Sequence, residues 1–279
     1  MARALVLVFL MAGAPLLRAQ DDPSWRQPFD PLRIVGNVYY VGTRGLSSFL
    51  IVTPGGGIII DSGAADSVPF IRANVEKLGF RLSDVKILLT GHAHFDHVGG
   101  HADLQRLSGA QVMVMDADRL ALESGVDRSA LGARGWKPVA IDRVLKDGDK
   151  VTLGGVSLTA HLTPGHTQGC TTWTMEALQD GKKYQVAFTC SVTINEGVHL
   201  VGNPRVPAIA DNYAQAFRVL HGLKANVFLA EHGAVFGLED KARRASTAAG
   251  VNPFVDPDGY QRFVERAEQT YLKQLAAEK

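Results

Sequence analysis

The chain contains, at residues 90–100, the segment Thr90-Gly-His-Ala-His-Phe-Asp-His-Val-Gly-Gly100, which carries four candidate metal ligands within six residues. These are His92, His94, Asp96 and His97, and neutral imidazoles and carboxylates are common zinc ligands. Because the apolar run of residues 85–90 comes directly before them, we expect them where a buried strand ends. A chance cluster on a polar surface loop is the alternative. Four such residues directly after a buried strand argue against it.

Two further histidines lie in short motifs far along the chain. His166 is in Thr-Pro-Gly-His-Thr-Gln-Gly, between two predicted strands, and His232 is in Leu-Ala-Glu-His-Gly, after a short one. His101 follows the cluster inside a predicted helix, and we expect it at the surface or supporting the cluster from behind. The isolated histidines are expected to have ordinary structural roles; they are His161, His199 and His221.

The rest of the chain alternates between strand and helix patterns. We predict strands at residues 37–42, 48–53, 57–61, 85–90, 111–115, 139–145, 156–162, 171–175, 184–189 and 227–230. We predict helices at residues 65–78, 98–107, 117–124, 211–220, 239–248 and 259–277. Each half begins with strands and ends with helices, and no Pro-Ser linker separates the halves. The sequence therefore predicts one α/β domain made from two sheet-and-helix halves.

Composition and charge exclude several classes of protein. The 279 residues include 29 Lys and Arg against 28 Asp and Glu, a formal net charge of +1. Nucleic-acid-binding proteins need a basic excess, so we expect no nucleic-acid partner. A hydrophobic content of 46% argues against a disordered chain. Two cysteines are too few for a disulfide scaffold or a cysteine-rich zinc module.

The first nineteen residues have the pattern of a cleaved signal peptide. Arg3 precedes the apolar run of residues 4–17, and Ala19 is a small residue at the expected cleavage point. These fourteen apolar residues are too few to span about 30 Å of hydrocarbon. No later stretch is long and apolar enough to do so. We expect residues 1–19 to be removed on export to the periplasm and residues 20–279 to form a single domain.

The motif His-Ala-His-Phe-Asp-His at residues 92–97 resembles the H-x-H-x-D-H signature of the metallo-β-lactamase superfamily. His166 lies in a segment similar to the superfamily's T-P-G-H-T motif, and His232 lies in a segment similar to its last histidine motif. The gaps of 69 and 66 residues between these motifs also suit that superfamily. The resemblance implies an αββα sandwich, in which two mixed sheets are flanked by helices and metal is held at one edge.

The resemblance also implies two zinc ions, each held by three side chains. His92, His94 and His166 would hold one ion. Asp96, His97 and His232 would hold the other. Three protein ligands leave a position open for water or substrate, as in catalytic zinc sites. Zinc lowers the pKa of bound water to about 7, so a metal-bound hydroxide would exist near neutral pH.

Ser191 indicates which subclass of the superfamily the chain resembles. Thiolesterases, lactonases and phosphodiesterases of this superfamily typically carry a metal-bridging Asp in a pattern like F-T-G-D, whereas this chain has Phe188-Thr-Cys-Ser191. A serine cannot bridge two zinc ions as a carboxylate does. Subclass B3 metallo-β-lactamases resemble this chain here, since they have the histidines, a serine at this position and no cysteine ligand. In another subclass of these enzymes a metal-binding cysteine would stand at the position of Ser191. Cys190 is one residue before that position, and adjacent residues of a strand face opposite sides, so we do not expect Cys190 to bind metal.

The function that the resemblance implies is zinc-dependent hydrolysis of the β-lactam ring of antibiotics, giving antibiotic resistance. Asp96 would orient the hydroxide, and Ser191 and Thr193 would bind the substrate carboxylate or order water. For Thr193, an ordinary hydroxyl at a strand end is an equal interpretation. The enzyme is expected to act as a monomer. One alternative is another hydrolase of the fold, a lactonase or a thiolesterase of the glyoxalase II type. A non-catalytic zinc-binding protein is a third alternative.

The two cysteines flank a predicted hairpin. Its turn is the segment Leu178-Gln-Asp-Gly181, and a turn centred on Asp180 would place Cys170 opposite Cys190. A disulfide and two buried free thiols are both compatible with this arrangement. We expect free thiols, because a shift of one residue in register separates the pair and directly opposed strand cysteines are often strained.

Two long segments near the motifs have no regular pattern. Residues 124–137 contain three glycines and Trp136, and residues 195–210 contain two prolines. Loops of this kind often form a substrate-facing wall, and plain surface connections are the alternative.

Overall fold

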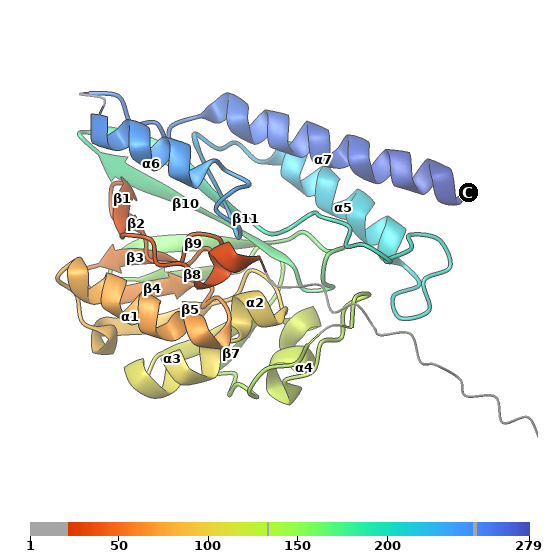
Figure 1. The fold of residues 1–279 in the computed structure, drawn as a ribbon, viewed down its shortest axis with the longest axis horizontal. Helices are drawn as coiled ribbons and strands as arrows, with labels where there is room; N and C mark the ends of the chain where they lie inside the picture. Colours follow the sequence, from red (N-terminus) through yellow and green to blue (C-terminus); the bar gives the residue numbers. More distant parts are fainter. Residues whose placement is uncertain (1–21, 133, 248–249) are drawn as a thin grey trace, which may run out of the picture.

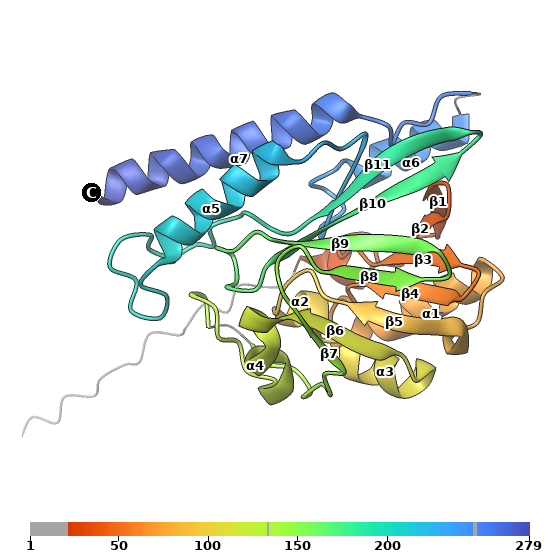
Figure 2. The ribbon, with the colours of Figure 1, turned by 180° about the vertical axis from the view of Figure 1, so that it is seen from behind.

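The computed structural model describes residues 22–132, 134–247 and 250–279. Two β-sheets pack face to face, and helices cover the outer side of each (Figures 1 and 2). The predicted αββα sandwich of two mixed sheets is therefore confirmed. The signal peptide predicted for residues 1–19 lies outside the described residues.

The first sheet contains seven strands that follow one another in chain order. They are β1 (Leu32–Val35), β2 (Val38–Tyr40), β3 (Phe49–Thr53), β4 (Gly56–Ile60), β5 (Val85–Leu89), β6 (Gln111–Met115) and β7 (Arg143–Leu145). Strands β1 to β4 pair antiparallel, and β4 to β7 pair parallel. Its outer helices are α1 (Val68–Lys77), α2 (Phe95–Val98), α3 (His101–Ser108) and α4 (Asp116–Ser124). Short 3₁₀ turns lie at Pro23–Arg26, Ala65–Ser67 and Leu82–Asp84.

The second sheet contains five strands in the order β12-β11-β10-β9-β8. They are β8 (Lys150–Leu153), β9 (Val156–Leu162), β10 (Thr171–Gln179), β11 (Lys182–Thr189) and β12 (Val227–Ala230). Only β11 and β12 are parallel neighbours in this sheet. The remaining helices lie on its outer side in Figure 1; they are α5 (Ile209–Gly222), α6 (Leu238–Thr247) and α7 (Pro257–Glu278).

The apolar runs of the sequence are strands buried on both faces. In β5, Ile87 and Leu89 belong to the core between the sheets, whereas Leu88 belongs to the core beneath the helices. Ile71 of α1 and Leu104 of α3 belong to that second core. A strand covered on both sides needs apolar residues at every position, so its sequence reads as a continuous run rather than an alternation.

The hairpin of β10 and β11 extends further than predicted. Gln179 pairs with Lys182, so the turn consists of Asp180 and Gly181 alone. Both have positive φ angles, 50° and 74°, which a two-residue type I′ turn requires. The turn is therefore centred between residues 180 and 181 rather than on Asp180. This shifts every cross-strand pair of the hairpin by one residue from the predicted pairing.

Several predicted boundaries differ from the structure. Strands β1 and β8 were not predicted, because each has only four residues, of which two are buried in β1 and one in β8. The strand predicted at 139–145 is limited to β7. The helix predicted at 98–107 corresponds to α3, which begins only at His101, and the separate short helix α2 was not predicted. Gly99 and Gly100 lie between the two helices, and a Cβ on Gly99 would lie 2.3 Å from Phe95 O. Within the described residues, no helix is long and apolar enough to cross a membrane.

Candidate metal centre

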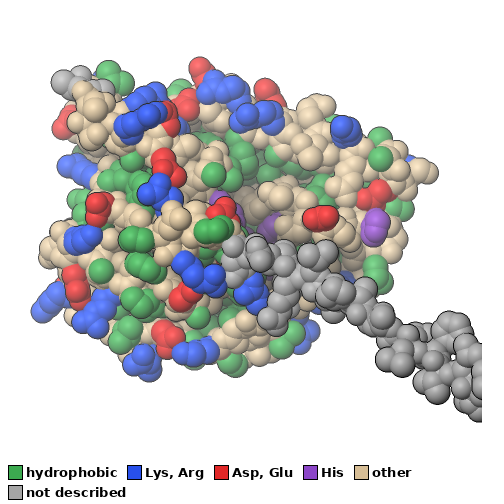
Figure 3. All heavy atoms as spheres, in the orientation of Figure 1, with side chains coloured by type: hydrophobic (Ala, Val, Ile, Leu, Met, Phe, Trp, Pro, Cys, Tyr) green, Lys and Arg blue, Asp and Glu red, His purple; other side chains and the backbone are tan. Residues whose placement is uncertain are grey.

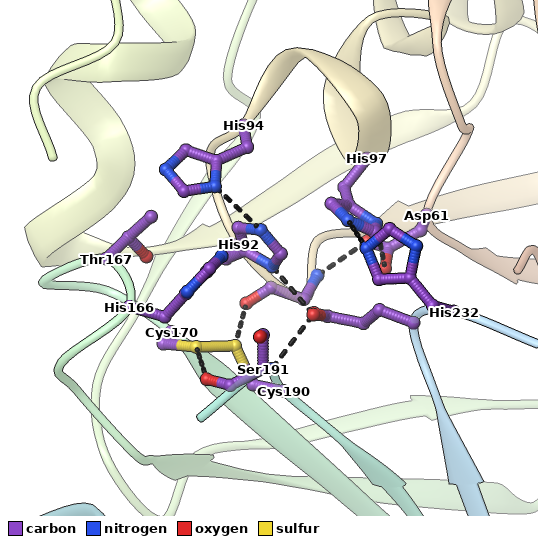
Figure 4. A network of polar contacts seen from close by, with 12 residues as sticks. Asp61, His92, His94, His97, His166, Thr167, Cys170, Cys190, Ser191 and His232 are labelled. Carbon is purple, nitrogen blue, oxygen red and sulfur yellow. Dashed lines mark hydrogen bonds and ion pairs between the residues drawn. A yellow bond between two sulfur atoms is a disulfide. The ribbon is translucent and has the colours of Figure 1, made fainter. Parts of the chain in front are cut away.

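The predicted ligands come from three separate segments that meet at one edge of the sandwich. His92 and His94 follow β5, and α2 carries Asp96 and His97. The connection from β9 to β10 supplies His166, and His232 follows β12 (Figure 4). Histidine side chains are visible in a hollow near the middle of the face in Figure 3.

The first group consists of His92, His94 and His166, one nitrogen of each lying within 4.8 Å of the others. His92 Nε2 is 3.1 Å from His94 Nδ1. The ring of His166 is 4.6 Å, centroid to centroid, from each of the other two rings. Three imidazoles therefore converge on one point, in the set that the sequence predicted.

The second group consists of Asp96, His97 and His232, which also lie within 4.8 Å of one another. His97 Nε2 is 3.2 Å from His232 Nε2, and Asp96 Oδ2 is 3.2 Å from His97 Nε2 and 3.6 Å from His232 Nε2. The ring centroids of His92 and His97 are 4.2 Å apart, so the two groups are adjacent. All six side chains predicted as ligands are thus brought together in two sets of three.

The outer nitrogens of four rings have oxygen neighbours. His166 Nδ1 is 2.6 Å from the carbonyl of Thr193, and His94 Nε2 is 2.9 Å from Ser129 Oγ. His92 Nδ1 lies 2.8 Å from Glu231 Oε2, and His97 Nδ1 lies 3.7 Å from Asp61 Oδ2. An N–H on each outer nitrogen leaves the inner nitrogen with a free lone pair, which is the form that binds metal.

The protonation preferences suit a metal site. Burial holds the pKa of His94 at about 4, that of His166 at about 3 and that of His232 at about 4, so these rings are neutral at pH 7. Burial disfavours a charged Asp96, but His97 beside it outweighs this effect and lowers the carboxyl pKa. Burial likewise opposes a charge on His97, and Asp96 reverses this and raises the pKa of His97 to about 10.

The inward-facing atoms fit cations in both groups. In each group two imidazole nitrogens face each other about 3 Å apart, and at most one of two such nitrogens carries a proton to donate. Three carboxylates, from Asp61, Asp96 and Glu231, are buried beside these rings. Histidines with buried carboxyl groups are a donor set suited to zinc and similar divalent metals, and a bound cation would displace the proton of His97 and balance the carboxylate charge.

Asp118 of α4 connects the two loops that carry the first group, and no sequence motif distinguishes it. Its Oδ2 accepts hydrogen bonds from the Ala93 amide (3.0 Å) and the Thr167 hydroxyl (2.7 Å), and its Oδ1 accepts one from the Gly169 amide (2.8 Å). Asp118 is fully buried. Its carboxylate therefore ties the loop of His92 and His94 to the loop of His166. Only its acidic residue type, in a helix after a buried strand, was visible in the sequence.

His101 is a buried residue, so the expectation that it lies at the surface is wrong. It is the first residue of α3, and only 1% of it is exposed. Its Nδ1 is 2.7 Å from Ser62 Oγ and its Nε2 is 3.2 Å from Thr90 Oγ1. Both ring nitrogens are engaged by hydroxyls, which agrees with the alternative expectation that His101 supports the cluster from behind.

Ser191 and Thr193 lie beside the first group, after β11. The Ser191 amide donates to Glu231 Oε2 at 2.9 Å, and the Thr193 amide donates to Ser191 Oγ at 3.3 Å. The Thr193 carbonyl accepts from both His166 and the hydroxyl of Tyr213. The contacts of Thr193 that orient the centre are therefore made by its backbone.

Cys170 and Cys190 form a disulfide, which corrects the expectation of free thiols. Their Cα atoms are 5.8 Å apart, and both residues are buried. Trp173 pairs with Phe188, so continuing the ladder would place Cys170 opposite Ser191 rather than Cys190. Both cysteines lie beyond the ends of their strands, where the register of the ladder no longer determines which residues meet, and the two can therefore bond.

The two long loops pack together beside the first group. Asp127 and Ser129 belong to the loop before β7, and Arg205 of the segment after β11 donates hydrogen bonds to the carbonyls of both residues. Ser129 in turn contacts His94. These loops therefore form one wall of the site.

Aromatic residues surround a cavity next to the second group. Trp25 lies with its ring centroid 5.8 Å from His232 and 6.0 Å from Phe95. The Arg134 guanidinium lies 4.2 Å from the centre of the Phe95 ring. A cavity of about 330 Å³ is lined by these residues and Trp136, without His232. Trp25 was not singled out from the sequence, since no local pattern relates it to His232.

Comparison with known proteins identifies relatives of this chain. The FEZ-1 metallo-beta-lactamase from Legionella gormanii is 43% identical in sequence, with a TM-score of 0.88 over 90% of this chain and 97% of that one. BJP-1, a subclass B3 metallo-beta-lactamase of Bradyrhizobium japonicum, is 36% identical, with a TM-score of 0.85 over 92% and 97%.

Curated sequence relatives match a smaller part of the chain. A hydroxyacylglutathione hydrolase from Rhodopseudomonas palustris is 34% identical over 119 residues, which are 43% of this chain and 39% of that protein. This chain spans about half or less of the length of the curated relatives it matches, for example 57% of a protein from Mycobacterium bovis. The sequence profile of the metallo-beta-lactamase superfamily, in contrast, matches residues 41–232. Because that match covers more than half of the chain and ends at His232, this protein belongs to the metallo-beta-lactamase superfamily.

Proposed function

We propose that this protein is an exported dizinc hydrolase that opens the β-lactam ring of antibiotics and thereby confers resistance. The observation that carries the proposal is the likeness, over 90% of the chain, to a solved metallo-beta-lactamase with 43% identity. The hydroxyacylglutathione hydrolase relative, by comparison, aligns over less than half of the chain. The two adjacent groups of three side chains support the proposal independently, because they suit two ions with open positions.

Each of the six side chains has a defined part in this proposal. His92, His94 and His166 would hold one zinc ion, and Asp96, His97 and His232 the other. Zinc supplies a Lewis acid for the lactam carbonyl and activates water near neutral pH. The protein then has to hold the rings in their metal-binding tautomer, and the carbonyl of Thr193 does so for His166 and the hydroxyl of Ser129 for His94.

The remaining steps use the chain's own polar groups. Asp96 would accept a hydrogen bond from the attacking water and so aim its oxygen at the carbonyl carbon. Ser191, with its amide held by Glu231, would present its hydroxyl to the substrate carboxylate, and Thr193 would assist it. Addition of water and cleavage of the C–N bond give a β-amino acid, with the second proton of water delivered to the nitrogen. No covalent intermediate with the protein is required.

The test is hydrolysis of a chromogenic cephalosporin by the purified protein. We expect turnover that a chelator abolishes and added zinc restores, with two zinc ions per chain by metal analysis. Expression in a sensitive bacterium should raise the β-lactam concentration needed to stop growth. Absence of β-lactam turnover by zinc-loaded protein, together with hydrolysis of lactones or S-acyl glutathione, would replace this proposal with a lactonase or thiolesterase.

Asp96→Ala is the most direct test of an individual role. Because Asp96 contacts both His97 and His232, we expect loss of the second ion and a fall in turnover of at least about 100-fold. Asp258→Ala, which changes an exposed carboxylate in the first turn of α7, is the matched control and should retain turnover. Wild-type turnover by Asp96→Ala with its full zinc content would contradict the assigned role.

The proposal also includes export to the periplasm and a monomeric state. Residues 1–19 would be cleaved, leaving a periplasmic chain that begins at Gln20 and acts as one monomeric domain. Amino-terminal sequencing of the periplasmic protein and its sedimentation velocity would check both expectations.

A further inference from the structure

Glu231 is a buried carboxylate directly behind the first group. It lies between β12 and His232, and only 6% of it is exposed. Its Oε2 is 2.8 Å from His92 Nδ1 and accepts a hydrogen bond from the Ser191 amide at 2.9 Å. Its Oε1 is fully buried and has no hydrogen-bond partner among the described residues. A buried carboxylate so arranged is costly unless the neighbouring centre is positively charged.

The chain makes room for this carboxylate with a glycine. A Cβ on residue 91 would lie only 2.1 Å from Glu231 Oε1 and 2.9 Å from Asp61 Oδ2. Any residue other than Gly91 would therefore push Glu231 away from the loop that carries His92. The close packing of Glu231 against this loop therefore depends on a glycine at position 91.

The position of Glu231 determines which nitrogen of His92 is available to a cation. His92 Nε2 faces the first group, 3.1 Å from His94 Nδ1, so Nδ1 must carry the proton when Nε2 binds metal. Nδ1 is the atom that Glu231 contacts. The contact is an ion-pair contact rather than an aligned hydrogen bond, because His92 Nδ1 has no hydrogen-bond partner among the described residues. A carboxylate at this distance still favours a proton on Nδ1 by charge attraction, and this leaves Nε2 as the metal-binding atom and makes the imidazole a stronger ligand.

Glu231 also connects His92 to His166. The Ser191 amide donates to Glu231, and two residues later the Thr193 carbonyl holds Nδ1 of His166. Two of the three rings in the first group are therefore oriented by one short segment, and Glu231 is the link between that segment and His92. The first group itself consists of imidazoles only, and Glu231 places a carboxyl oxygen 2.8 Å from one of them.

We propose that Glu231 is a positioning residue that sets the tautomer and orientation of His92 and, through the Ser191 amide, couples His92 to His166. The proposal rests on the metal centre of the proposed function and is independent of the identity of the substrate. A residue with this role should change metal affinity and the state of the His92 ring without touching the metal itself.

Two variants separate this role from a general effect on folding. Glu231→Ala removes the acceptor, and Glu231→Gln preserves the volume and one acceptor oxygen but removes the charge. Glu239→Gln is the matched control, because Glu239 is an exposed residue of α6 that pairs with Arg44. Competition titrations with zinc and a fluorescent chelator should show 10- to 100-fold weaker binding of one ion in Glu231→Ala and about 10-fold in Glu231→Gln. Glu239→Gln should bind both ions like the wild type.

The second readout is the imidazole N–H signal of His92 in ¹⁵N-histidine-labelled, zinc-loaded protein. The wild type should show a slowly exchanging Nδ1–H signal that exchanges rapidly in Glu231→Ala and shifts in Glu231→Gln. The control variant should keep it. If the variants that fold bind both ions with wild-type affinity and keep this signal unchanged, the proposal is overturned.

The experiments distinguish a failure of the proposed role of Glu231 from a failure of the proposed function. Wild-type protein that binds zinc but hydrolyses no β-lactam, with weaker binding in the Glu231 variants, would reject the substrate and retain the role of Glu231. A wild type that hydrolyses β-lactams, with Glu231 variants unchanged in affinity and signal, would reject the role of Glu231 alone.

Discussion

The buried histidines of this centre differ in what their ring nitrogens contact. His92, His97 and His166 each direct one nitrogen to an oxygen and the other toward neighbouring ligand candidates. Both nitrogens of His101, in contrast, lie beside the hydroxyls of Ser62 and Thr90. A ring with both nitrogens engaged by hydroxyls has no lone pair left for a cation. His101 therefore contributes to stability.

His101 should make the fold sensitive to acid. Burial lowers its pKa in the folded protein to about 4, whereas the unfolded value is near 6.5. The unfolded chain therefore takes up a proton first, and stability that is complete above pH 6.5 falls progressively as the pH approaches 4, by up to about 3 kcal/mol. His101→Asn should be less stable than the wild type at pH 7, with a difference that narrows toward pH 4.

Urea unfolding of both metal-free proteins between pH 4 and pH 8 measures this effect. Metal-free protein is needed because acid also releases metal from histidine ligands. The same difference in unfolding free energy at pH 4 as at pH 7 would show that His101 does not titrate in this way.

At the level of secondary-structure elements, helix α4 connects the loop after β5 with the loop between β9 and β10. Asp118 accepts hydrogen bonds from the Ala93 and Gly169 amides and from the Thr167 hydroxyl. In Asp118→Asn the amide group has a single acceptor oxygen, so at least one of these buried donors loses its partner. We expect a loss of about 1–3 kcal/mol in unfolding free energy and weaker metal binding by the first group. Asp116→Asn in the same helix, an exposed position, should leave both unchanged.

The disulfide ties the ends of β10 and β11 together beside the first group. It closes a loop between residues 20 apart, which corresponds to about 3 kcal/mol in the chain-entropy model. Replacing both cysteines by alanine should therefore lower the melting temperature by roughly 6–12 °C in a chain of this size. Intact mass after alkylation, with and without reductant, would detect the bond directly; alkylation of the unreduced, unfolded protein would show that it is absent.

Across the whole molecule, the candidate ligands join the two sheets. His92, His94, Asp96 and His97 follow a strand of the first sheet, whereas His166 and His232 follow strands of the second. A metal ion bound between them can exist only when both halves are folded and packed. Metal binding and the stability of the sandwich should therefore be strongly linked.

Removing metal should lower the melting temperature of the whole protein. At a metal concentration 1,000-fold above the dissociation constant, each ion stabilises the folded state by about 4 kcal/mol. Calorimetry before and after treatment with a chelator should show a fall, and Asp96→Ala, which would retain one ion, should show a smaller one. An unchanged melting temperature in the wild type would contradict the linkage.

Much of the architecture could be predicted because it depends on neighbouring residues. The apolar runs of β4 to β6 are local consequences of burial on both faces, and Asp180-Gly181 carries its own turn geometry. The ligand candidates at residues 92–97 were recognisable because imidazole and carboxylate side chains at such close spacing have few other uses. His166 and His232 were recognisable only through the resemblance of their motifs to those of the superfamily. The short strands β1 and β8 were missed, since four residues of which only one or two are buried produce no clear alternation of apolar and polar residues.

Residue types and local spacing in the sequence alone thus determined one α/β domain with two sheet-and-helix halves and the cluster of His92, His94, Asp96 and His97. The resemblance to the superfamily added the αββα sandwich and the ligands His166 and His232. Only the tertiary structure decided which distant groups meet them: Glu231 behind His92, Asp118 between two loops, and Cys170 bonded to Cys190 beyond their strand ends. The physical reason is that local patterns record burial and turn geometry. A contact between segments far apart in the chain depends on where each segment goes after its strand ends.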